Sequence, residues 1–209
     1  MLFITVLIVI GAIFLFYLNF FIIWKKLSSH DKKFESLVKY ISISAIIFTF
    51  IIPFISSTFF FTPSYFQNLY LWFFILGFIF IGVGIILIKE LFDQHDEFPL
   101  VAEIYEYHSE KAYSFVRHPF YSSLLLIFLG LSFICDSPFS ILLFPVLFLF
   151  FEFLCYLQEN KISSEKFPEQ YEAHLEKVEK RIFPPPYNFL IFIIYSLVLF
   201  IGLRNLVLL

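Results

Sequence analysis

The sequence predicts an all-α protein, a polytopic bundle of helices integral to a membrane. Of its 209 residues, 60% are hydrophobic and only 15% are charged, more apolar surface than a soluble domain of this length can bury. A bilayer accepts such a chain if its backbone is hydrogen-bonded internally, as helices or as a closed barrel. The apolar runs are long and do not alternate with polar residues, which favours helices.

Six apolar runs have about the 20 residues that a membrane span needs. A seventh segment, residues 164–183, places its apolar residues every three or four positions, which predicts an amphipathic helix lying along the membrane surface, with its charges on a solvated face. The first run is followed by Lys25 and has no charge before it, so we expect a retained span rather than a secretory signal. The predicted spans are residues 1–24, 40–61, 69–88, 120–135, 139–157 and 187–207.

The positions of the cations predict the orientation of the bundle. Every lysine and arginine except Arg204 falls in or beside the first, third and fifth loops between these spans. Cytoplasmic loops carry the excess of Lys and Arg, so we expect those three loops in the cytoplasm and both chain termini on the other side. The formal net charge of −3 argues against a nucleic-acid partner.

One membrane domain with three regions is expected. Residues 1–88 would hold three N-terminal spans, and residues 185–209 the C-terminal span. Between them, residues 89–184 contain most of the polar chemistry, a helical hairpin and the amphipathic helix. We therefore look for a functional site in this middle region.

Polar and aromatic residues gather just before the fourth span: Tyr113, Arg117, His118, Pro119 and Tyr121. Proline suits the first turn of a helix, which would put the arginine and the histidine at a helix N-terminus. Unpaired N–H groups and the helix dipole add positive potential there, so the place suits a carboxylate or a phosphate. The alternative is that Arg117 only anchors the helix at the headgroup level.

A second group lies at the end of the fifth span. Glu152, Tyr156 and Glu159 recur at steps of four and three, so they share one helix face. Glu152 stands among phenylalanines, and it is either a functional group facing the bundle interior or a structural glutamate that is neutral or reaches the interface. Because a tight turn joins the two spans, they are expected to be antiparallel, which brings both groups to the same end.

The pattern of these residues resembles the superfamily of isoprenylcysteine carboxyl methyltransferases and phospholipid methyltransferases. The resemblance covers residues 107–184 and differs from the family pattern at Lys111, Ser123, Asn160, Pro168 and His174. It is carried by Tyr113, Val116, Arg117, His118, Pro119 and Tyr121, then Glu159 and Asn160, and finally Phe167, Tyr171, Val178 and the closing Ile182, Phe183 and Pro184.

The resemblance implies an enzyme that uses S-adenosyl-L-methionine to methylate a lipid-like or isoprenoid acceptor at the cytoplasmic face. Arg117, His118 and Glu159 are the expected catalytic residues, and Glu152 and Tyr156 are expected to line the acceptor's path. His118 is the candidate base for an acceptor that must lose a proton. The expected cofactor-binding residues are Tyr113, Arg117, His118, Pro119, Tyr121, Glu159 and Asn160.

Two other functions remain open on the sequence. An arginine-histidine-proline block also occurs in membrane reductases of the sterol reductase type, which would bind NADPH, and a small transporter could use Glu152 and Arg117 as a gate. No metal site is expected, because the spacing of His95, Asp96 and His108 matches no pair of ligands on a helix face.

Overall fold

The computed structural model describes residues 40, 43, 44, 47, 50–55, 69–94, 111–159, 168–178 and 180–207. These residues form helices and connecting segments, without any strand in the ranges just given. The first predicted span, residues 1–24, lies outside them. The described positions between residues 40 and 55 are helical, as the second predicted span requires.

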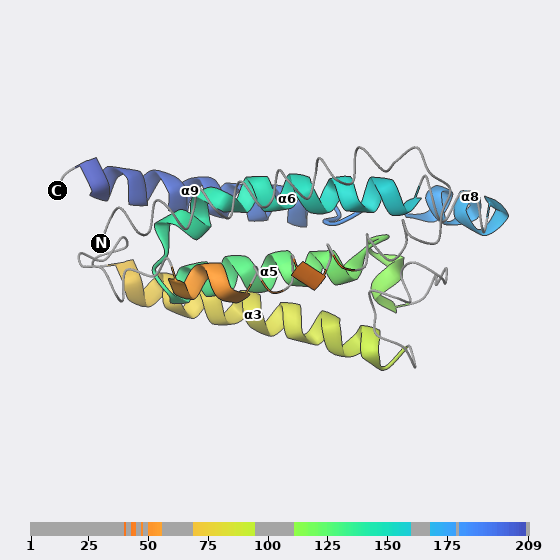
Figure 1. Cartoon of the computed structure of the whole chain (residues 1–209), viewed down its shortest axis with the longest axis horizontal. Helices are drawn as coiled ribbons and strands as arrows, with labels where there is room; N and C mark the ends of the chain where they lie inside the picture. Colours follow the sequence, from red (N-terminus) through yellow and green to blue (C-terminus); the bar gives the residue numbers. More distant parts are fainter. Residues whose placement is uncertain are drawn as a thin grey trace.

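Four long helices form the described bundle (Figure 1). They are α3 (Tyr70–Phe92), α5 (Pro119–Ile134), α6 (Pro138–Gln158) and α9 (Tyr187–Val207), with the short η3 (Lys111–Ser114) and α8 (Pro168–Lys177) at one end. Their bounds lie within a few residues of the four spans predicted from residue 69 onward. The sequence therefore located these helices correctly.

α5 is the central helix of the bundle. Fourteen of its residues are buried around its whole circumference, as expected for a helix that is apolar on every side and enclosed by protein. It packs against α3 on one side and α6 on the other, and α6 packs against α9. The hydroxyl of Tyr70, at the start of α3, donates to the carbonyl of Ile134 at the end of α5 (2.9 Å), so these two helices are antiparallel.

Glycines let α3 and α5 approach closely. A Cβ atom on Gly130 would lie 2.6 Å from the carbonyl oxygen of Gly77, and a Cβ atom on Gly77 would lie 2.7 Å from that of Gly130. A Cβ atom on Gly84 would come within 2.9 Å of the carbonyl oxygen of Ser123. Small residues at such positions are how membrane helices bring their backbones into contact.

The hairpin between α5 and α6 turns within three residues. Asp136 adopts a left-handed conformation (φ 48°), which aspartate tolerates better than most residues. Ser137 then caps α6 by accepting a hydrogen bond from the Ser140 N–H (3.3 Å), and Pro138 occupies the first turn. The predicted antiparallel hairpin is confirmed.

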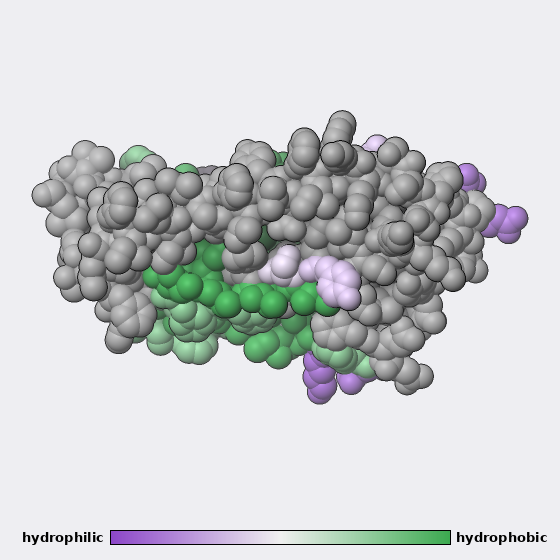
Figure 2. Space-filling model, in the orientation of Figure 1, coloured by the Kyte–Doolittle hydropathy of each residue, from purple (hydrophilic) through white to green (hydrophobic). Residues whose placement is uncertain are grey.

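The outer faces of α3 and α9 expose large apolar side chains, and Figure 2 shows part of this apolar surface. Two described segments, Tyr70–Phe92 and Phe139–Tyr156, are long and apolar enough to cross a bilayer. α5 and the apolar part of α9, Tyr187–Ile201, are shorter. The structure thus supports a helical membrane protein, while the count of six spans stays a prediction. The exposed residues include Leu71, Trp72, Ile75, Phe78, Ile79, Ile85, Ile86, Phe189, Leu190, Ile193, Leu197 and Phe200.

One prediction about helix length is wrong. The amphipathic helix was expected to continue through Ile182, but α8 ends at Lys177. The chain that follows crosses the start of α5, where the N–H groups of Arg117 and His118 donate to the carbonyls of Lys180 (3.0 Å) and Arg181 (2.8 Å). Pro184 disfavours a helical conformation at the residue before it, and these two hydrogen bonds satisfy N–H groups that lie ahead of the first turn of α5.

Candidate functional site

The candidate site lies where α5 begins and α6 ends. His118 is the N-cap residue of α5 and Pro119 occupies its first turn, so Arg117 and His118 stand at the helix N-terminus as predicted. Glu159 is the C-cap residue of α6. Since the two helices are antiparallel, these three side chains meet at one end of the hairpin.

Glu159 is the centre of this cluster, and its side chain is fully buried. One carboxylate oxygen, Oε1, lies 3.3 Å from Nη1 of Arg117 and 3.2 Å from Nε2 of His118. The other oxygen, Oε2, accepts a hydrogen bond from Nε of Arg181 (2.8 Å). A buried carboxylate is stable only when it is paired in this way, and Glu159 has three basic partners.

These contacts decide the charge state of Glu159. Burial alone would raise its pKa, but the hydrogen bonds with His118 and Arg181 and the positive charge of Arg117 outweigh burial. The pKa of Glu159 therefore lies below its ordinary value, and the group is a carboxylate at neutral pH. Burial opposes the charge of Arg181 too, but its hydrogen bond with Glu159 and the charges of Glu159 and Glu152 raise its pKa above the ordinary value.

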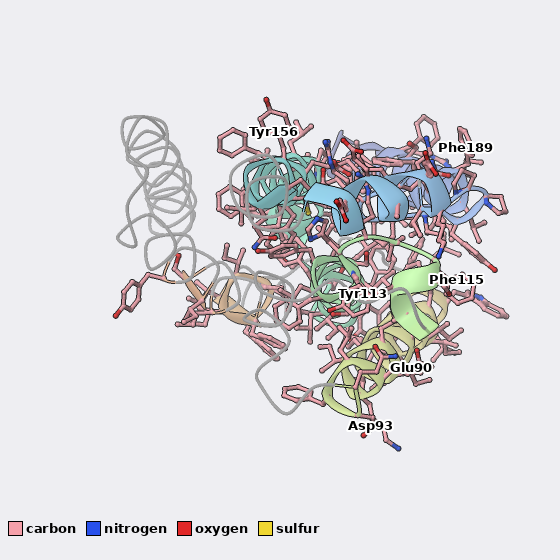
Figure 3. The ribbon with its side chains drawn as sticks, turned by 90° about the vertical axis from the view of Figure 1, so that its right-hand side faces the viewer. Glu90, Asp93, Tyr113, Phe115, Tyr156 and Phe189 are labelled. Carbon is pink, nitrogen blue, oxygen red and sulfur yellow. The ribbon has the colours of Figure 1, made fainter. Side chains whose placement is uncertain are left out.

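Arg181 also reaches the second acid predicted on α6. Its Nη1 lies 3.6 Å from Oε2 of Glu152, and its guanidinium carbon lies 5.7 Å from the centre of the Tyr156 ring. Such a distance suits a cation–π contact. Glu152 is 30% exposed, and Tyr156 projects from the outer side of α6 in Figure 3. Glu152, Tyr156 and Glu159 thus do share one face, and Arg181 covers it.

Tyr121 and Gln158 form a second, uncharged part of the site. Gln158 Nε2 donates to the Tyr121 hydroxyl (2.8 Å), and both side chains are fully buried. The Tyr121 ring stacks on Phe151, with 5.0 Å between ring centres, and its centre lies 6.1 Å from that of His118. The neutral pair therefore borders the charged cluster.

Tyr113, Asn160 and Pro119 were also expected in the site. Tyr113 lies in η3, which packs against α3, and its ring is buried in the bundle (Figure 3). Asn160 lies outside the described residues. Pro119 is buried, but it offers no polar side chain, so its part is to shape the first turn of α5.

Arg181 and Gln158 were not among the residues predicted for the site. The helical pattern of residues 164–183 assigned Arg181 to a solvated face, although the proline run from Pro184 indicates an earlier end to the helix. Gln158 precedes Glu159, but nothing in its neighbours predicts that it faces Tyr121. The described residues contain no group of three His, Cys, Asp or Glu side chains that could hold a metal ion. His95, Asp96 and His108 lie outside the described ranges.

A family model described as phospholipid methyltransferase matches residues 72–170. The chain resembles the phospholipid methyltransferase family. The match confirms the resemblance inferred from the sequence and supports a membrane methyltransferase in general. It includes nearly all of α3, then η3, α5 and α6, whereas Arg181 lies beyond it. No curated protein and no solved structure matches the chain.

Proposed function

We propose that this protein is an S-adenosyl-L-methionine-dependent methyltransferase that acts on a lipid-like or isoprenoid acceptor at the cytoplasmic face of a membrane. The observation that carries the proposal is the buried carboxylate of Glu159 with Arg117, His118 and Arg181 around it. The resemblance to the phospholipid methyltransferase family supplies the reaction class.

The charged and polar side chains of the site fit S-adenosyl-L-methionine, which supplies an activated methyl group when it is bound. This cofactor carries a carboxylate, an ammonium group, hydroxyls and a sulfonium. Two guanidinium groups suit the carboxylate, and Arg117 stands at a helix N-terminus, where an anion is favoured further. The Glu159 carboxylate suits the ammonium group or the hydroxyls, and the Tyr121 and Tyr156 rings suit a sulfonium.

Arg117 and Glu159 face each other in the structure, so each would exchange a protein partner for a cofactor group. Arg181 makes this exchange less costly because it stays paired with Glu152 when Glu159 takes a new partner. A buried charge that loses its only partner would cost several kcal/mol. We propose that Arg181 is therefore part of the binding machinery.

His118 is proposed to accept the proton of an acceptor that reacts as an amine. Its Nε2 faces the Glu159 carboxylate at 3.2 Å, and a carboxylate at this distance stabilises the positive charge that the ring gains. A carboxylate acceptor would need no base. In either case the contribution of these residues is to orient the reactants for an in-line displacement.

Glu152 and Tyr156 are proposed to border the path of the acceptor. Both lie on the face of α6 that leads away from Glu159, and both are partly exposed. α9 begins alongside α6 and runs to the end of the bundle opposite α8 (Figure 1). If the site faces the cytoplasm, the C-terminal end of α9 lies on the other side, as the distribution of cations predicts.

The test uses the purified protein in detergent with three additions: S-adenosylhomocysteine, NADPH and none. We expect S-adenosylhomocysteine alone to raise the unfolding temperature, because a ligand at 100 times its Kd stabilises the folded state by about 2.7 kcal/mol. Stabilisation by NADPH instead would favour a reductase, and stabilisation by neither would favour a transporter.

Methyl transfer is tested in membranes that contain the protein. The labelled methyl group of S-adenosyl-L-methionine should be found in lipids extracted from these membranes, and Arg117→Ala should abolish this incorporation. Glu169→Ala, an exposed position on α8, is the matched control and should leave it unchanged. No transfer by a well-folded, well-expressed protein would contradict the proposed function.

A further inference from the structure

Gln158 has a buried side-chain oxygen without a hydrogen-bond partner in the part of the chain that the structure describes. It is the last residue of α6 and is fully buried. Its Nε2 atom donates to the Tyr121 hydroxyl, whereas its Oε1 atom has no hydrogen-bond partner among the described residues. Leaving a buried amide oxygen without a donor costs free energy, so a specific reason for this orphan acceptor is expected.

The position of Gln158 relates this oxygen to the candidate site. The residue immediately precedes Glu159 on α6, and its hydrogen-bond partner Tyr121 lies beside His118. The orphan acceptor therefore belongs to a side chain that is bonded to Tyr121, whose ring stacks on Phe151 and lies beside His118.

The chemistry around Gln158 differs from that around Glu159. Arg117, Arg181 and Glu159 suit the charged end of a zwitterionic cofactor. Gln158 is neutral and has aromatic neighbours, and such an environment suits a nucleobase, whose faces stack on aromatic rings. A glutamine side chain also matches the edge of adenine, because its carbonyl oxygen can accept from the exocyclic amine.

We infer that Gln158 is a further cofactor-binding residue, whose Oε1 accepts a hydrogen bond from the exocyclic amine of adenine. The inference rests on the proposed function, since it concerns the adenosyl end of the same cofactor. The charged end of the cofactor would then lie on the Arg117 and Glu159 side of the site, and its adenine on the Tyr121 side.

The test compares two ligands that differ at one group. S-adenosylhomocysteine carries the exocyclic amine, and S-inosylhomocysteine carries a carbonyl oxygen there instead. We expect the unmodified protein to bind the adenosyl compound at least tenfold more tightly, because the carbonyl would face Oε1 without a donor. Isothermal titration calorimetry in detergent measures both affinities.

Gln158→Met replaces the amide with an apolar chain of similar length. We expect it to weaken the binding of S-adenosylhomocysteine about tenfold. The ratio between the affinities for the two ligands should fall to less than threefold. If the variant bound both ligands more weakly by the same factor, the inference would be overturned. Equal weakening would mean that Gln158 acts only structurally, through Tyr121, and does not contact the amine. The unfolding temperature without ligand shows whether the variant is folded.

The unmodified protein gives a test that does not depend on any variant. Equal affinity for the two ligands would overturn the role of Gln158 and leave the proposed function standing. Binding of neither ligand would contradict the proposed function itself, and this inference would fall with it.

Discussion

Arg181 donates a hydrogen bond of 2.8 Å to Glu159, although 22 residues separate them in the chain. The contact joins the segment after α8 to the end of α6. The same segment accepts hydrogen bonds from the two N–H groups that precede α5. Three parts of the chain are thus fixed together at Glu159.

Replacing Arg181 should therefore weaken both folding and cofactor binding. Arg181→Ala removes the donor to Oε2 of Glu159 and the cation beside Glu152, and we expect a loss of about 1 to 3 kcal/mol in the free energy of unfolding. Denaturant unfolding in detergent measures it. Lys180→Ala is the control, because the exposed Lys180 contributes its backbone carbonyl to the contact with Arg117, and that group remains. Equal losses in the two variants would contradict this account.

The charge of Glu159 should make stability depend on pH in one direction. Its pKa is lower in the folded protein than in the unfolded chain, so its contribution is fully present above about pH 5 and is lost as the pH falls through the lowered value. The unfolding temperature should therefore drop in acid. Glu159→Gln should lose about 3 kcal/mol at neutral pH, because Arg117 and Arg181 then lose the Glu159 charge, and should show a shallower acid dependence.

An exposed glutamate on α8 provides the comparison for this experiment. Glu169→Gln should keep both the stability at neutral pH and the steep acid dependence of the unmodified protein. If Glu159→Gln retained the same acid slope as Glu169→Gln, the assigned charge of Glu159 would be wrong.

The glycine contact between α3 and α5 should be intolerant of a methyl group. Gly130→Ala forces a Cβ atom to 2.6 Å from the backbone oxygen of Gly77, so the helices must separate, at a cost of about 1 to 3 kcal/mol. Gly82→Ala is the matched control on α3, because a Cβ atom there meets nothing within 4 Å. We expect the control to be neutral or slightly stabilising. A stable Gly130→Ala protein would show that the contact is looser than described.

Two neighbouring serines of α5 should differ in their effect on the site. The Ser122 hydroxyl donates to the carbonyl of Ile182 and so helps to hold the segment that carries Arg181. Ser122→Ala should therefore weaken the binding of S-adenosylhomocysteine and cost about 1 kcal/mol of stability. Ser123 is equally buried, and among the described residues its hydroxyl donates to Phe120 within its own helix (2.6 Å), so Ser123→Ala should leave ligand affinity unchanged. Calorimetric titration of both variants with S-adenosylhomocysteine measures the two affinities.

The sequence predicted the helices well because their signals are local. Long apolar runs, the prolines at Pro119 and Pro138 and the turn at Asp136 act within a few residues, and they located α5, α6 and the hairpin between them. The meeting of Arg117 with Glu159 followed from that hairpin, since antiparallel neighbours bring the start of one helix to the end of the other.

The contributions of Arg181 and Gln158 depend on contacts that local signals do not encode. Arg181 reaches Glu159 only because the chain leaves its helix at Lys177 and crosses the start of α5. Gln158 reaches Tyr121 through the rotation of α6 about its own axis, which the packing against α5 determines. Periodicity over residues 164–183 favoured a continuous helix, and the hydrogen bonds to Arg117 and His118 outweighed that preference.

The segment from Lys180 to Ile182 also has a consequence for the order in which the molecule is made. A ribosome synthesises the hairpin of α5 and α6 first, and at that stage Glu159 has Arg117 and His118 beside it but lacks its closest cation. The N–H groups of Arg117 and His118 likewise gain their acceptors, the carbonyls of Lys180 and Arg181, only when the chain has grown by more than sixty residues. The charged centre of this protein is therefore completed only after the segment that carries Lys180 and Arg181 has been synthesised.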